Sequence, residues 1–252
     1  MLPPHIRQSK KPSPKRPSGP SPGIRVVTSL AGLGLLLWFA ATVASDPRWW
    51  PWAPLDPLAS PGPMTSLQLA KTASDPALCH PALDRIAGRT VQRLAERVDG
   101  PTCHIRTRVE LSRLGAVTLA PVETRCETAL RLAMWTRHVL QPAALAHLGS
   151  PIVEVLHLSS YACRRIRTTA GIGASMSAHA TARAIDISGV RLANGRVVPL
   201  LGRWSGAGAD QAFWRAARDG ACPYFRTVLS PDYNVLHADH FHLEQGRWRA
   251  CR

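Results

Sequence analysis

One uncharged apolar segment divides the chain into parts that must fold in different surroundings. Residues 26–44 form a run of 19 residues without Asp, Glu, Lys or Arg. With a helical rise of about 1.5 Å per residue, such a run can cross the core of a bilayer, which is roughly 30 Å thick. We therefore predict one transmembrane helix over residues 26–45.

The segment before this run is basic and rich in proline. Residues 1–25 contain six Lys or Arg, seven Pro and no acidic residue, so they cannot bury enough apolar surface to fold. The positive-inside rule keeps this disordered tail in the cytoplasm. We therefore expect a single-pass inner-membrane protein with a periplasmic C-terminal part. A cleaved signal peptide is the alternative, but the apolar run exceeds the usual ~7–15 residues of such a peptide, which favours an uncleaved anchor.

A linker and one domain are predicted beyond the membrane segment. Residues 46–74 are rich in Pro and Trp, and the cluster of Trp49, Trp50 and Trp52 is typical of a membrane–water interface. Residues 75–252 are numerous enough to enclose one hydrophobic core.

The net charge of +15 raises the question of nucleic-acid binding. The chain has 27 Arg but only 4 Lys, and three of these Lys lie in the first 25 residues. The arginines are spread along the chain instead of forming a patch. We therefore expect no nucleic-acid partner, in agreement with the predicted export.

All six cysteines lie after the apolar run, and their even number suggests disulfides in an oxidising compartment. Six cysteines allow 15 pairings, and the sequence does not choose among them. Pairing neighbours in sequence order gives Cys79–Cys103, Cys126–Cys163 and Cys222–Cys251.

The apolar pattern of the exported part predicts an α+β fold, in which antiparallel strands and helices are intermixed. Helical spacing predicts helices over residues 81–98, 122–148 (interrupted by Pro142) and 210–218. Strands are predicted over residues 104–111, 116–119, 152–158, 182–192, 197–200, 225–229 and 241–244.

Two segments carry side chains typical of metal chemistry. The first runs from Ser177 to Ile187, and the second reads His-Ala-Asp-His-Phe-His-Leu-Glu over residues 237–244. In a strand, His240 and His242 would share one face and could converge on one ion. His179 should lie in a turn that brings it back toward Asp186 on its own strand. Two His and one Asp with an open fourth position are typical of catalytic zinc.

These segments carry a family resemblance. The blocks Ser160-Tyr-Ala-Cys-Arg164, Ser177-x-His179 with Ala184-Ile-Asp186, Ala221-Cys-Pro-Tyr-Phe225 and His237-x-Asp-His-Phe-His242 resemble the bacterial extensin-like C-terminal domain. The spacing of His179, Asp186 and the His-x-His motif is also similar to that of zinc peptidases of the lysostaphin, D-Ala-D-Ala peptidase and hedgehog group. The resemblance implies a small antiparallel sheet flanked by helices that carries a zinc site.

The resemblance also implies roles for individual residues. His179, Asp186 and His242 match the zinc ligands, and Asp239 falls where related enzymes place the general base. His240 matches a histidine beside the bound water, and Arg164 matches an arginine that contacts substrate. Ala182 stands where the related peptidases usually have Gly, and Arg164 is three residues past Tyr161 instead of adjacent to it.

These observations lead to one preferred function and two alternatives. We expect a membrane-anchored periplasmic Zn²⁺-dependent peptidase that acts on peptidoglycan peptides, as a D-Ala carboxypeptidase or an endopeptidase. The alternatives are a non-catalytic, zinc-stabilised cell-envelope binding module and a structural envelope protein without metal.

Overall fold

The computed structural model describes residues 22–88, 91–246 and 248–252, in two compact units, Met1–Asp46 and Pro47–Arg252. The first unit contains helix α1 (Pro22–Ser45). Within the described residues, Val26–Ser45 is the single helix long and apolar enough to cross a membrane, and a signal sequence would pass the same test. Most of the predicted disordered tail, residues 1–21, lies outside the described residues.

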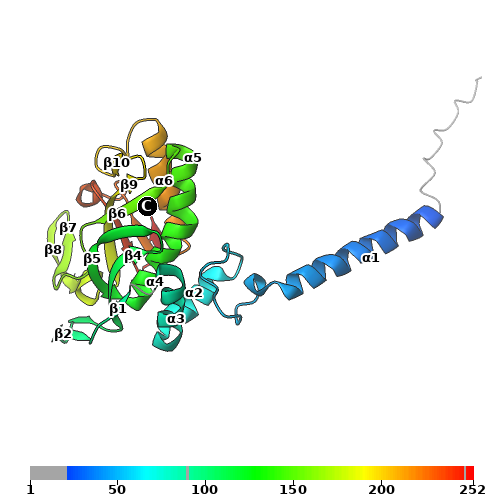
Figure 1. The fold of residues 1–252 in the computed structure, drawn as a ribbon, viewed down its shortest axis with the longest axis horizontal. Coiled ribbons are helices and arrows are strands. Elements are labelled where there is room, and N and C mark those ends of the chain that lie inside the picture. The colour runs from blue at the N-terminus through cyan, green and yellow to red at the C-terminus, as the bar shows by residue number, and fades with distance from the viewer. Residues whose placement is uncertain (1–21, 89–90, 247) are drawn as a thin grey trace, which may run out of the picture. The chain divides into compact units, whose positions relative to one another are not determined.

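The second unit is built on a nine-stranded sheet (Figure 1). Most neighbouring strands are antiparallel, but β5–β6 and β11–β13 are parallel. The α+β class is therefore confirmed, whereas the sheet is larger than expected and mixed instead of purely antiparallel. Its order is β1 (Gln92–Arg93), β4 (Arg108–Leu114), β5 (Val117–Arg125), β6 (Ile152–His157), β9 (Ala184–Leu192), β12 (Phe241–Glu244), β11 (Thr227–Leu229) and β13 (Ala250–Cys251), and β10 (Val197–Pro199) pairs with β9.

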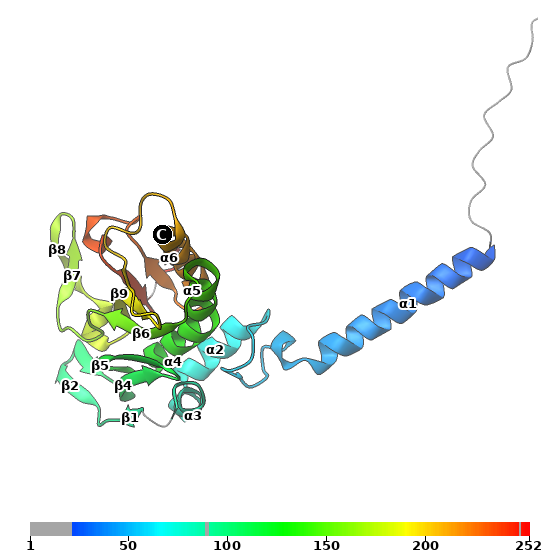
Figure 2. The ribbon, with the colours of Figure 1, turned by 45° about the horizontal axis from the view of Figure 1, so that its top comes forward.

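Helices cover one side of this sheet, and two separate hairpins complete the unit. Figures 1 and 2 show α4 and α5 on one side of β5 and β6, with the β7–β8 hairpin on the other. The helices are α2 (Thr65–Ser74), α3 (Pro76–Ala87), α4 (Cys126–Trp135), α5 (Gln141–Leu148) and α6 (Ala209–Ala221), and the hairpins are β2 (Arg97–Gly100) with β3 (Cys103–Ile105) and β7 (Arg165–Thr168) with β8 (Gly171–Met176). Helix α2 lies within the predicted linker, and its Leu69 is fully buried in the core.

Side-chain alternation in β9 and β12 determines which face of the sheet carries the candidate site. Ile185, Ile187, Phe241 and Leu243 are fully buried members of the hydrophobic core. Phe241 packs edge-on against Trp214 of α6, with ring centroids 5.4 Å apart. Because successive strand residues point to opposite faces, Asp186 and His242, which pair across the two strands, must point away from this core.

The helical segment predicted over residues 122–148 begins later than expected and is not broken by Pro142. Strand β5 continues to Arg125, so α4 starts at Cys126. A π-helical turn, η2 (Thr136–Leu140), connects α4 to α5, and Pro142 falls in the first turn of α5. The wider turn tolerates a proline that has no backbone N–H to donate.

Two other predicted elements were also wrong. The helix predicted over residues 81–98 instead spans Pro76–Ala87 and is followed by the short strands β1 and β2. The strand predicted over residues 104–111 is divided into β3 and β4 by a turn in which Thr107 has a φ of 48°.

Three disulfides join the cysteines of the second unit. The bridge Cys222–Cys251 is confirmed, but the predicted pairs Cys79–Cys103 and Cys126–Cys163 are wrong. The observed bridges are Cys79–Cys126, which joins α3 to the first residue of α4, and Cys103–Cys163, which joins β3 to the loop before β7. Pairing the cysteines in sequence order gave two wrong bridges, because β4 and β5 lie between the bridged elements in the sequence, whereas the fold brings those elements side by side.

We predict that Phe241→Ala lowers the free energy of unfolding by about 3–5 kcal/mol, because it leaves a cavity beside Trp214. Trp248→Ala is the control: this side chain is 80% exposed, so its loss should change stability by no more than about 0.5 kcal/mol. Urea unfolding of the full chain in detergent measures both values. Equal losses in the two variants would contradict the assignment of Phe241 to the core.

Candidate metal centre

His179 is held in a short turn that is anchored to the loop before β7. It lies in the 3₁₀ helix η3 (Ala178–Thr181), whose N-cap Ser177 accepts a hydrogen bond from the His179 backbone N–H. The ring Nδ1 lies 2.9 Å from the carbonyl oxygen of Ser160. The chain then leaves η3 through Ala182 in the left-handed region, with φ 50°, a conformation that Gly adopts more readily than Ala. The expected turn between His179 and Asp186 is therefore present.

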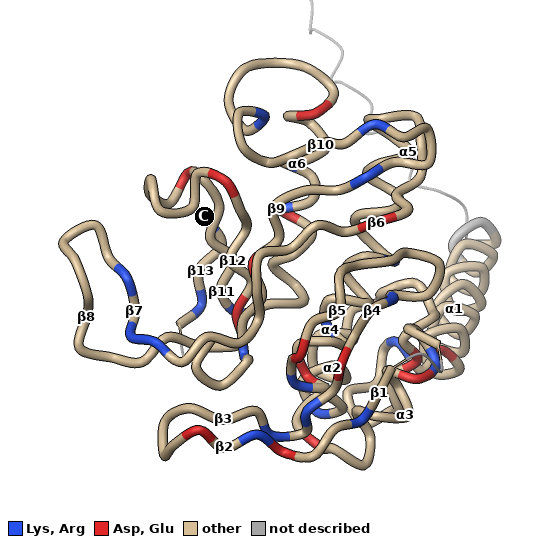
Figure 3. The backbone as a smooth tube through the Cα atoms, turned by 60° about the vertical axis from the view of Figure 1, so that its left-hand side comes forward, with Lys and Arg blue, Asp and Glu red and all other residues tan. Residues whose placement is uncertain are grey.

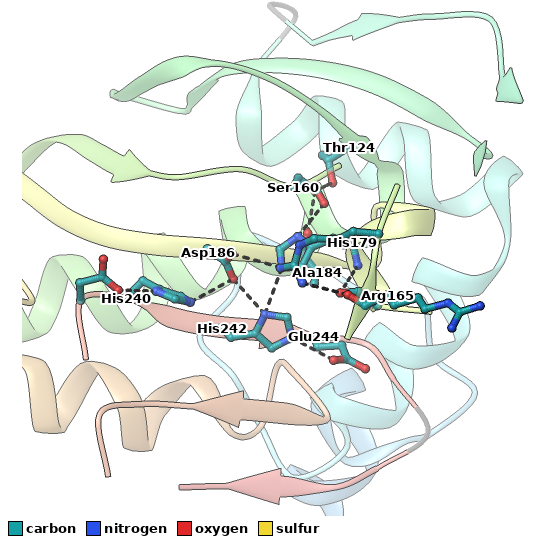
Figure 4. Close-up of polar contacts among 12 residues, drawn as sticks. Thr124, Ser160, Arg165, His179, Ala184, Asp186, His240, His242 and Glu244 are labelled. Atoms are coloured by element: carbon teal, nitrogen blue, oxygen red, sulfur yellow. Dashed lines mark hydrogen bonds and ion pairs between the residues drawn. The ribbon is translucent and has the colours of Figure 1, made fainter. Parts of the chain in front are cut away.

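Asp186 and His242 face each other from neighbouring strands and meet His179. His242 Nδ1 lies 2.9 Å from Asp186 Oδ1, and His179 Nε2 lies 3.1 Å from His242 Nδ1. His179 Nε2 also lies 3.2 Å from Asp186 Oδ2. Figure 4 shows the three side chains pointing toward one another. Ligand atoms around tetrahedral zinc lie about 3.3–3.4 Å apart when each bond is about 2.0–2.1 Å long, so this cluster could hold such an ion.

In each imidazole, the nitrogen that points away from the cluster, which we call the outer nitrogen, already has a hydrogen-bond acceptor beside it. A carbonyl oxygen only accepts, so His179 Nδ1 must donate to Ser160. His242 Nε2 lies 2.9 Å from Glu244 Oε2 and donates to that carboxylate. When both rings are neutral, the inner nitrogens, His179 Nε2 and His242 Nδ1, carry lone pairs that point toward the Asp186 carboxylate. Three acceptors meet without a donor, which is the arrangement that a cation completes.

The pKa values of Asp186 and His242 are shifted in opposite directions. Burial alone would raise the pKa of Asp186, but the imidazoles of His179 and His242 beside its carboxylate outweigh burial and hold that pKa well below its usual range. Burial would lower the pKa of His242, but Asp186 and Glu244 raise it to about 9. At neutral pH the cluster therefore holds a proton on His242.

A second pair of side chains lies beside the cluster. His240 Nε2 is 3.8 Å from Asp186 Oδ1, and His240 Nδ1 is 2.7 Å from Asp239 Oδ1. The Asp239 side chain is 53% exposed, whereas that of His240 is 14% exposed. His237 packs near both His240 and His242, and burial together with these two rings lowers its pKa to about 4.

Arg164 lies near the cluster along the backbone, but its side chain is directed elsewhere. Its carbonyl oxygen accepts from the N–H of Ser177, the N-cap of η3. Its guanidinium donates to the carbonyl oxygen of Arg165, 3.3 Å away. Across the part of the chain that the structure describes, no hydrogen bond or ion pair joins Arg164 to His179, Asp186 or His242.

Glu244 was missed by the sequence reasoning as a member of the site. It lies two residues after His242 on β12 and so shares a face with it, a spacing that could have indicated the contact. Ser160 was noticed only as part of a sequence block, yet its carbonyl fixes the His179 ring.

The fold and the cluster together define an α+β protein with a buried two-histidine, one-aspartate site. The family described as extensin-like protein C-terminus matches residues 77–252. Because the match covers more than half of the chain, the protein belongs to this family. No curated protein and no solved structure matches the chain.

A metal that binds this cluster must displace a proton from it. Since the pKa of His242 in the metal-free protein is about 9 instead of the ordinary 6.5, zinc binding at pH 7 should release about one proton per chain. Apparent affinity should rise about tenfold per pH unit from pH 7 to 9 and then level off. Without metal, the stabilisation from this proton is complete below pH 6.5 and disappears as the pH rises through 9.

Calorimetry in buffers of different ionisation enthalpy measures this release. His179→Ala should abolish zinc binding, whereas His147→Ala, at an exposed position in α5, should not. Zinc binding without proton release would indicate that the metal binds elsewhere.

The negative charge of Glu244 next to His242 should strengthen metal binding. Glu244→Gln retains an oxygen acceptor near His242 but removes the negative charge. Zinc affinity should therefore fall by about 10- to 100-fold, the usual effect of losing an outer-shell partner. Competition with a chromophoric chelator measures the constant, and Glu154→Gln, on β6, is the matched control. An unchanged affinity would show that Glu244 does not orient His242.

Proposed function

We propose that this protein is a membrane-anchored periplasmic zinc peptidase that cleaves peptides of the bacterial cell wall. The observation that carries the proposal is the convergence of the His179, Asp186 and His242 lone pairs beside the Asp239–His240 pair. The similarity of the motif spacing to the lysostaphin and D-Ala-D-Ala peptidase group supports the substrate class. Zinc held by the three side chains would polarise a substrate carbonyl and lower the pKa of a bound water.

The geometry favours His240 over Asp239 as the general base. His240 Nδ1 donates to Asp239 Oδ1, which leaves a lone pair on Nε2, the atom nearest the cluster. From there His240 would accept the proton of the attacking water and return it to the leaving amine. Asp239, which binds the far side of this ring, would orient it and stabilise its charged form. The role expected for Asp239 from the resemblance thus becomes a positioning role.

Helix α1 supports the proposed location. We propose that it is an uncleaved anchor with the basic N-terminal tail in the cytoplasm, which places the second unit in the periplasm. An oxidising periplasm agrees with three disulfides and no free cysteine in the second unit. The substrate would then be peptidoglycan or its peptides.

Mass spectrometry of purified peptidoglycan digested by the full chain in detergent tests the function. New peptide ends should appear with zinc and disappear when a chelator is added. His240→Ala should lower turnover by about 10²-fold or more, whereas Asp239→Asn should lower it less and leave zinc content unchanged.

Two outcomes would change the assignment. If Asp239→Asn were inactive while His240→Ala kept full activity, the roles of the two residues would be exchanged. If the protein bound about one zinc per chain but produced no new ends, the peptidase proposal would fail in favour of a zinc-stabilised binding module.

A further inference from the structure

The β7–β8 hairpin begins next to the cluster of His179, Asp186 and His242. The Ser177 N–H donates to the Arg164 carbonyl and closes the base of the hairpin, and Ser177 also caps the turn that carries His179. The bridge Cys103–Cys163 anchors the same base to β3. Within the described chain, β7 and β8 pair only with each other. The hairpin is therefore held at its base beside the site, and along its length it pairs with no other strand of the described chain.

The hairpin carries positive charge that no ion pair among the described residues balances. All four residues of β7 are exposed, and Arg165 and Arg167 stand two apart on it. The sequence contains no acidic residue between Glu154 and Asp186. Figure 3 shows basic residues along β7 and none that are acidic on the hairpin. Among the described residues, neither Arg165 nor Arg167 has an ion pair, although arginines elsewhere in the chain, such as Arg191 with Glu154, do.

The hairpin also exposes apolar side chains between these charges. Ile172, which pairs with Arg167 across the hairpin, is 78% exposed, and Ile166 is 41% exposed. Guanidinium groups next to aliphatic surface suit a peptide that combines carboxylates with small apolar side chains.

We propose that the β7–β8 hairpin is a docking arm for an acidic peptide strand, in which Arg165 and Arg167 bind carboxylates of the substrate. This inference rests on the proposed function, because its occupant is the wall peptide that the metal site would cleave. The attachment of the arm next to His179 favours a substrate over an unrelated partner. The arm would hold the peptide while its scissile bond reaches the cluster.

Binding of the full chain in detergent to isolated peptidoglycan sacculi tests the arm without requiring turnover. The double variant Arg165→Gln/Arg167→Gln should bind roughly three- to tenfold more weakly, the combined effect of two exposed charge pairs. Arg165→Glu/Arg167→Glu should bind more weakly still. Wild-type binding should weaken as salt rises, and the Gln variant should show a smaller dependence.

The control is Arg113→Gln/Arg137→Gln, which removes the same charge from exposed positions on β4 and η2. It should bind sacculi like the wild type, and all variants should retain zinc. Equal binding by the hairpin and control variants would overturn the docking arm. Sacculus binding that depends on Arg165 and Arg167 without any cleavage would instead overturn the peptidase and leave the arm in place.

Discussion

The candidate site depends on one constraint: the outer nitrogens of two histidines are bound to acceptors, so their inner lone pairs must meet a buried carboxylate. Ser160 and Glu244 impose this arrangement on His179 and His242. Asp186 is only 7% exposed, and an isolated carboxylate at such a position would be costly. A single bound proton can form hydrogen bonds with only one or two of the three acceptors at a time, so at least one acceptor has no donor. A divalent cation with tetrahedral geometry serves all of them.

The hydrophobic core and a small polar network hold the three side chains in this position. The buried apolar residues of β9 and β12 fix the register that sets Asp186 opposite His242. Hydroxyl groups support the loop that carries His179. Thr128 donates to the Ala182 carbonyl, and Ser160 donates to the Ala184 carbonyl, at 2.9 and 2.7 Å. These bonds help to keep Ala182 in a left-handed conformation that a residue with a Cβ otherwise avoids.

The sequence predicted the parts of this site that depend on local patterns. Alternation predicted that Asp186 and His242 lie on strands, and His179 was expected in a turn that leads back toward Asp186; both expectations are confirmed. The disulfides were mostly missed because their pairing depends on how α3, β3 and α4 pack, which no local pattern contains. The β7–β8 hairpin was missed because its second strand is rich in Gly and small residues, which give little strand signal. Glu244 could have been found from its i, i+2 relation to His242.

The exposure of the side chains indicates the direction from which a substrate of the proposed peptidase would reach a metal bound at this cluster. On the Ser160 side, the ring of His179 is 1% exposed and has no access to solvent. Exposure rises through His242 and His240, at 11% and 14%, to 53% at Asp239. An open coordination position on the His240 side would therefore lie toward solvent, which is also where the proposed reaction needs a proton acceptor. A purely structural zinc site normally has four protein ligands, whereas this cluster offers three. Here three candidate ligands converge from the buried side, and the imidazole of His240, held by Asp239, lies on the more exposed side.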